Sequence, residues 1–169
     1  MESKNLIQIK PEVGKMAKAG AVFLILWGIL HIWVGTEGAH QYFVSDVGSL
    51  WKMLIGGKNA PFEAIQITTD TITANAQKHL ILNFCLDVGG YGVLGIILAL
   101  LIYKKGSWSA YFIALIVIGI CDLSFAFSMV TSGIIQLSWG TVSGPIIWVV
   151  AIILIPFGLP KFKVGSGLN

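Results

Sequence analysis

The sequence predicts an all-α membrane protein: a four-helix transmembrane bundle with an amphipathic helical cap in its long first, outer loop. Of its 169 residues, 56% are hydrophobic and 11% are charged, and the mean hydropathy is +0.83. Soluble domains carry about 25% charged residues, more than twice this share. We therefore expect residues 1–169 to form a single integral membrane domain whose main partner is the lipid bilayer.

Four mostly apolar stretches reach the length of about 20 residues that a helix needs to cross the hydrocarbon core. Backbone amides in lipid must be paired within the protein, and no alternating segments of about ten residues recur that would indicate a β-barrel. The stretches are therefore expected to be transmembrane helices. Their approximate bounds are 16–35, 80–103, 108–132 and 141–159.

The connection between the first two predicted helices, residues 36–78, is far longer than the connections of about 2–8 residues that are usual in helix bundles. It contains an apolar stripe at helical spacing that ends at Gly56-Gly57. Such a helix either lies in the membrane interface or packs over the mouth of the bundle. A second helix is predicted over 62–76, after Pro61, with an extended run as the alternative because four threonines lie between Thr68 and Thr73. The stripe residues are Phe43, Val44, Val47, Leu50, Trp51, Leu54 and Ile55.

Lysine supplies all eleven basic residues, and its distribution predicts the orientation of the chain. Eight lysines lie on the side of the two termini and three on the opposite side. Cytoplasmic loops carry the excess of basic residues, so both termini are expected in the cytoplasm and the protein in the plasma (inner) membrane. The absence of arginine disfavours a nucleic-acid partner. The eight are Lys4, Lys10, Lys15, Lys18, Lys104, Lys105, Lys161 and Lys163; the three are Lys52, Lys58 and Lys78.

Five polar residues inside the predicted helices are the candidate binding site: His31, Asn83, Asp87, Tyr91 and Asp122. Ionisable side chains are costly in lipid and tend to face the bundle interior or a wet cavity. A rise of about 1.5 Å per residue places His31, Asp87 and Asp122 in the outer half of the membrane, and Asn83 and Tyr91 share a helix face with Asp87. The residues therefore predict one polar pocket there, and hydrogen bonding between helices is the structural alternative for each carboxylate.

The pocket favours binding or passage of a small solute, a proton or a cation, because a buried carboxylate can take up and release a proton. Four helices are few for alternating access, so a transporter of this size would work as a homo-oligomer. Two alternatives stay open. One is an accessory or structural subunit of a larger membrane complex. The other is a membrane-embedded subunit of an enzyme that binds a metal, a haem or another redox group.

A metal site has weak support in the three histidines, His31, His40 and His79. They lie toward the outer side, but they form no HExxH motif and no pair at i, i+4. No cofactor can be named from them. Enzymatic nucleophiles are also not indicated, because the chain has no GxSxG motif and Cys85 and Cys121 have no histidine at helical spacing.

Overall fold

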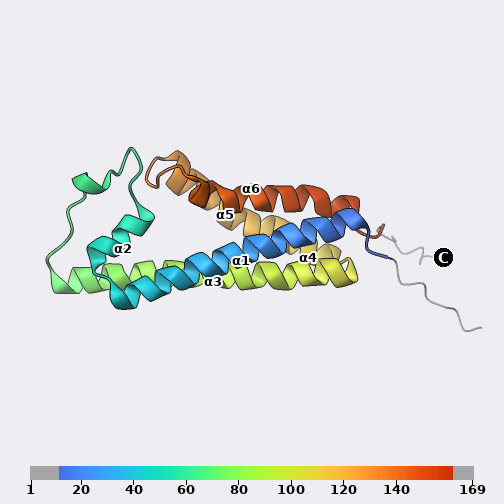
Figure 1. The fold of residues 1–169 in the computed structure, drawn as a ribbon, viewed down its shortest axis with the longest axis horizontal. Coiled ribbons are helices and arrows are strands. Elements are labelled where there is room, and N and C mark those ends of the chain that lie inside the picture. The colour runs from blue at the N-terminus through green and yellow to red at the C-terminus, as the bar shows by residue number, and fades with distance from the viewer. Residues whose placement is uncertain (1–11, 162–169) are drawn as a thin grey trace, which may run out of the picture.

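The computed structural model describes residues 12–161, of which 79% are helical and none lies in a strand (Figure 1). The all-α prediction is confirmed for this part of the chain. Lys4, Lys10 and Lys163, which contributed to the predicted orientation, lie outside the described residues.

Four helices are long and apolar enough to cross a membrane. The first is α1 (Lys15–Val44), and the second is α3 (Thr71–Lys105). The third helix runs from Trp108 to Thr131 through α4 (Trp108–Ile113), η2 (Ala114–Ile118), α5 (Gly119–Phe125) and η3 (Ala126–Thr131). The fourth is α6 (Trp139–Leu154), followed by η4 (Ile155–Phe157).

The first two helices are longer than the apolar stretches that predicted them. α1 continues past 35 to Val44, and Gln41 there donates its side-chain amide to Glu37 Oε1 at 2.8 Å, one turn earlier. α3 begins at Thr71 instead of 80, after Asp70, whose carboxylate accepts the backbone N–H of Thr73 at 2.8 Å. Hydropathy marks the part of a helix suited to lipid, whereas hydrogen bonds at i, i+4 and an N-cap decide where it ends.

The predicted helix over 62–76 is confirmed only for 71–76, which form the start of α3, and is wrong for 62–70. Phe62–Ala64 form one short 3-10 turn, η1, and residues 65–70 have no regular structure before α3 begins. Thr68 and Thr69 are β-branched and disfavour a helix, and the Asp70 cap starts the next one.

The predicted apolar stripe is divided between two helices. Phe43 and Val44 end α1 and are exposed, whereas α2 (Val47–Leu54) starts after the Asp46 cap. α2 packs on α1 and α3, and its Leu50 is fully buried beside Ile81 and Cys85 of α3. The part of the stripe on α2 therefore faces protein, whereas Phe43 and Val44 do not.

After α2 the chain crosses to the turn between η3 and α6. The backbone N–H of Gly57 donates to Ile134 O at 3.0 Å, and that of Asn59 donates to Gly133 O at 2.9 Å. Residues 45–70 thus extend from α1 and α3 to the third and fourth helices at one end of the molecule, which we call the loop end (Figure 1).

The opposite end brings the start of α1 together with the end of the fourth helix. Gly14 N donates to Gly158 O at 2.8 Å, and a Cβ at Gly106, in the α3–α4 turn, would lie 2.6 Å from Pro160 Cδ. Gly106 has φ +58°, which favours glycine. We call this the lysine end, because its basic residues in the described chain are Lys15, Lys18, Lys104, Lys105 and Lys161.

α1 lies at the centre of the arrangement, against both α3 and α6. Its contact with α3 depends on glycine: a Cβ at Gly28 would lie 2.6 Å from Gly92 O, and a Cβ at Gly92 would lie 2.6 Å from Gly28 O. Small residues let membrane helices approach closely. Trp27, one residue before Gly28, is fully buried in the core formed by all four long helices.

Candidate functional site

Asp122 of α5 is the only charged side chain that is buried among residues 12–161, with 4% of its surface exposed. Its carboxylate has two partners on α1. Trp27 Nε1 donates to Asp122 Oδ2 at 2.8 Å, and His31 Nε2 lies 3.5 Å from Oδ1. These three residues, which we call the proton cluster, are the candidate site.

Trp27 and His31 are one helical turn apart, and their rings stack with centroids 3.8 Å apart and planes inclined by 27°. His31 Nδ1 lies 2.9 Å from the backbone oxygen of Trp27. A carbonyl oxygen can only accept a hydrogen bond, so Nδ1 carries a hydrogen. The second nitrogen, Nε2, therefore faces Asp122 and is the atom at which the proton content of the ring can change.

The space between His31 Nε2 and Asp122 Oδ1 has room for one shared proton. If it is on the ring, an imidazolium faces a carboxylate; if it is on Asp122, a neutral imidazole faces a carboxylic acid. Both forms have zero net charge, which suits a buried site. Loss of the proton would leave a buried carboxylate, and the lone pairs of Asp122 Oδ1 would face the lone pair of His31 Nε2. The pair can thus bind one proton.

The course of the third helix places Asp122 toward α1. α5 lies between two π-helical segments, η2 and η3. Such segments are rare in proteins as a whole, but they are often found at functional sites. Trp148 Nε1 of α6 donates to Ala114 O at 3.1 Å in the first segment. The Ser128 hydroxyl donates to Ser124 O at 2.6 Å at the second. Such bonds satisfy backbone oxygens where the regular helical pattern is interrupted.

A glycine of α6 leaves room for the imidazole. A Cβ at Gly144 would lie 2.9 Å from His31 Cε1, so a larger residue there would push the ring out of place. The His31 side chain is 20% exposed, compared with 5% for that of Asp122. The histidine is therefore the less buried member of the pair.

The structure brings His31 and Asp122 together, but it places Asn83, Asp87 and Tyr91 on a different surface, which we call the exposed α3 face. All three are exposed, and Asn83 Nδ2 donates to Asp87 Oδ2 at 3.0 Å within the same helix. The Tyr91 side chain lies near that of Cys121, the neighbour of Asp122. The single five-residue pocket expected from the sequence is thus divided, because the opposite side of α3 holds the glycines that contact α1.

Trp27 was not among the predicted site residues. An indole in an apolar stretch is most simply explained as a core or interface residue, and its spacing of four from His31 was the available signal. Its partner Asp122 is 95 residues away, so the hydrogen bond itself could not be predicted.

The other two histidines lie apart from the proton cluster, at the loop end. His79 Nε2 lies 3.0 Å from the Tyr42 hydroxyl, and its Nδ1 lies 2.8 Å from Asn75 O. His40 is exposed. Among residues 12–161 no group of three or more His, Cys, Asp or Glu side chains could hold a metal ion.

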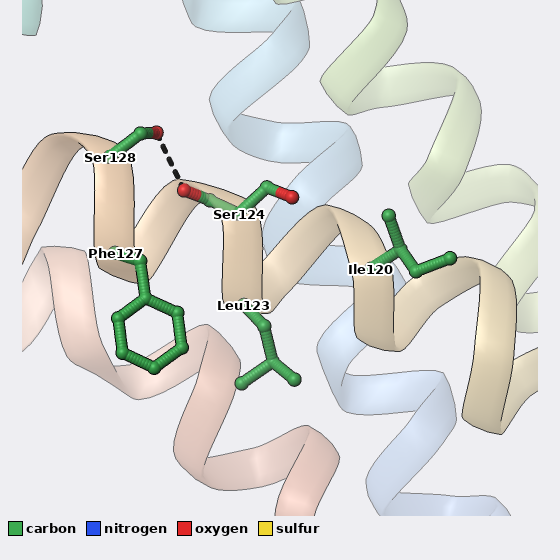
Figure 2. Close-up of a pocket in the computed structure, with 5 residues that line it drawn as sticks. All are labelled: Ile120, Leu123, Ser124, Phe127 and Ser128. Atoms are coloured by element: carbon green, nitrogen blue, oxygen red, sulfur yellow. Dashed lines mark hydrogen bonds between the residues drawn. The ribbon is translucent and has the colours of Figure 1, made fainter.

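Two hollows lie outside the proton cluster. One is an open depression along the third helix, and Figure 2 shows that its lining comes from neighbouring turns of that helix. The second, of about 140 Å³, lies between α1, α2 and α3 and includes Glu37. The depression along the third helix is lined by Ile120, Leu123, Ser124, Phe127 and Ser128.

No family model matches the chain, and comparisons with curated proteins and with solved structures also give no match. The proposed function therefore depends on the geometry of the proton cluster.

Proposed function

We propose that the chain is a small transmembrane protein that binds and releases a proton between His31 and Asp122, as part of the movement of protons or of a small solute across the membrane. The observation that carries this proposal is the buried carboxylate of Asp122 facing His31 Nε2, while His31 Nδ1 is committed to the Trp27 carbonyl. Composition and four apolar helices support the membrane location.

The distribution of lysine supports an orientation with the lysine end in the cytoplasm and, with it, a location in the plasma membrane. Asp122 is then about 21 Å above the level of Trp108, at about 1.5 Å per residue. In a hydrocarbon core of about 30 Å, this depth is in the outer half. A proton that enters from outside would meet the partly exposed His31 before the buried carboxylate.

The exposed α3 face belongs to a different environment in this orientation. Asp87 is about 26 Å above Lys104 along α3, close to the outer boundary of the hydrocarbon core. Lipid headgroups and water can solvate the Asn83–Asp87 pair there. Contact with a second copy or with a larger complex stays a prediction for this surface.

Proton uptake by the purified protein tests the binding step. Wild-type protein in detergent, weakly buffered and acidified from alkaline to mildly acidic pH, should take up about one more proton per chain than the His31→Gln/Asp122→Asn variant. Retention of the same monodisperse state by both proteins would show that the fold is intact. Uptake that is equal in the two proteins would contradict the proposal.

Proteoliposomes test whether the bound proton crosses the membrane. With a pH-sensitive dye inside, an imposed pH gradient should decay faster with wild-type protein than with Asp122→Asn. Asp87→Asn is the matched control, because it removes a carboxylate from the exposed α3 face and should leave the rate unchanged. Wild-type decay no faster than that of empty liposomes would contradict passage while leaving the binding step to be decided by proton uptake.

A further inference from the structure

Trp27 contacts both ionisable members of the proton cluster. Its indole N–H donates to Asp122, its ring stacks on His31, and its backbone oxygen accepts from His31 Nδ1. The side chain is fully buried, so water does not compete for these contacts. A residue placed in this way can influence which of the two partners holds the shared proton.

The indole N–H favours an ionised Asp122. A hydrogen bond from Trp27 Nε1 at 2.8 Å stabilises a carboxylate more than a carboxylic acid, because the charged acceptor makes the stronger bond. It also occupies Oδ2 and leaves Oδ1 as the oxygen that faces the imidazole.

The stacked ring favours a protonated His31. A cation over the face of a tryptophan ring is attracted by its negative π surface, and the centroid distance of 3.8 Å is well inside the range of about 6 Å in which this attraction acts. The Trp27 carbonyl adds to it, because its bond from Nδ1 strengthens when the imidazole is charged.

Burial acts in the opposite direction. In a low-dielectric interior, separated charges are disfavoured relative to a neutral acid beside a neutral imidazole. We propose that Trp27 is a positioning residue that holds the shared proton on His31, so that the resting site is an imidazolium–carboxylate pair. This inference depends on the proposed proton-binding function. Without the indole, the proton would move to Asp122.

Nitrogen NMR of histidine in lipid nanodiscs tests the resting state directly. The His31 signal is assigned by its disappearance in His31→Gln, and its shifts show whether one or both ring nitrogens carry hydrogen. At neutral pH the wild-type protein should show the imidazolium form. A neutral His31 beside a protonated Asp122 would overturn the role of Trp27 and leave the proposed binding of a proton intact.

Infrared spectroscopy tests the role of the indole. Trp27→Phe keeps an aromatic ring but removes the N–H, and should give a carboxylic-acid band that is absent from wild type and abolished by adding Asp122→Asn. The ratio of neutral to ionic pairs should rise about tenfold or more, as expected for loss of a hydrogen bond to a charged group. Trp148→Phe is the matched control, because its indole N–H bonds to a backbone oxygen.

The possible outcomes separate the two proposals. An unchanged infrared spectrum in folded Trp27→Phe would overturn the positioning role. If Trp27→Phe does not fold, the wild-type NMR measurement still decides whether His31 holds the shared proton. A wild-type His31 that is neutral beside an ionised Asp122 from acidic to alkaline pH would contradict the proposed function itself.

Discussion

Asp122 and Asp87 are the same residue type in similar apolar stretches, yet they have different surroundings. Asp122 is buried and bonded to Trp27, 95 residues away in the chain. Asp87 is exposed, and its amide partner, Asn83, lies one turn earlier on its own helix. The comparison shows that an apolar sequence around a carboxylate marks a membrane segment but does not determine which side of the helix is covered.

The largest effect should distinguish the covered and open sides of α3. Gly92→Leu places side-chain atoms where a Cβ alone would lie 2.6 Å from Gly28 O, so α1 and α3 must separate. Overpacking of this kind costs about 1–3 kcal/mol or more. Gly90→Leu is the control, because a Cβ there meets no atom within 4 Å. Thermal unfolding in detergent should show a lower midpoint for Gly92→Leu alone, and equal midpoints would contradict the packing of α1 on α3.

The second prediction compares the two carboxylates by truncation. Asp122→Ala removes the acceptor of a buried indole N–H, and an unsatisfied buried donor costs about 1–3 kcal/mol. Asp87→Ala removes an exposed group and should change the free energy of unfolding by no more than about 0.5 kcal/mol. Unfolding in mixed micelles measures both values. A larger loss for Asp87→Ala would mean that the exposed α3 face is covered by a partner.

A double-mutant cycle sharpens the comparison. Substitution of His31 and Asp122 by Ala, singly and together, should give an interaction energy of about 0.5 kcal/mol or more, because the pair is partly shielded from solvent. The same cycle on Asn83 and Asp87 should give about 0.2–0.5 kcal/mol, as for exposed pairs at i, i+4. Strict additivity at His31 and Asp122 would show that the two residues do not act as a pair.

The smallest effect concerns two exposed carboxylates outside the long apolar helices. The backbone N–H of Ser49 lowers the pKa of Asp46, and the hydroxyl of Thr73 lowers that of Asp70, each from the ordinary 3.8. A lowered pKa contributes stability above the ordinary value, and this contribution is lost as pH falls through the folded value. Acidification below about pH 3.8 should therefore loosen the first turns of α2 and α3.

Hydrogen exchange at decreasing pH measures this loosening, after correction for the intrinsic pH dependence of exchange. Asp46→Asn and Asp70→Asn serve as controls, because asparagine can still cap a helix and does not titrate in this range. Protection that falls equally in the Asn variants would show that the cap carboxylates are not responsible.

Much of the architecture could be predicted from residue type and order. Hydropathy located all four long helices, and the spacing around Leu50 indicated the amphipathic helix that became α2. Local signals also explain the errors. The stretch at 62–76 lacks a continuous helix because Thr68 and Thr69 disfavour one and Asp70 starts α3.

The sequence by itself determined which segments are apolar and which positions within them carry charge, because these depend on composition and on the fixed rise of a helix. Only the tertiary structure decided which charge is buried. Glycine contacts turn one side of α3 toward α1 and leave Asp87 outside, while two π-helical segments accompany the placement of Asp122 beside Trp27 and His31. Helix rotation and close approach arise from contacts between residues far apart in the chain, and no local pattern specifies them.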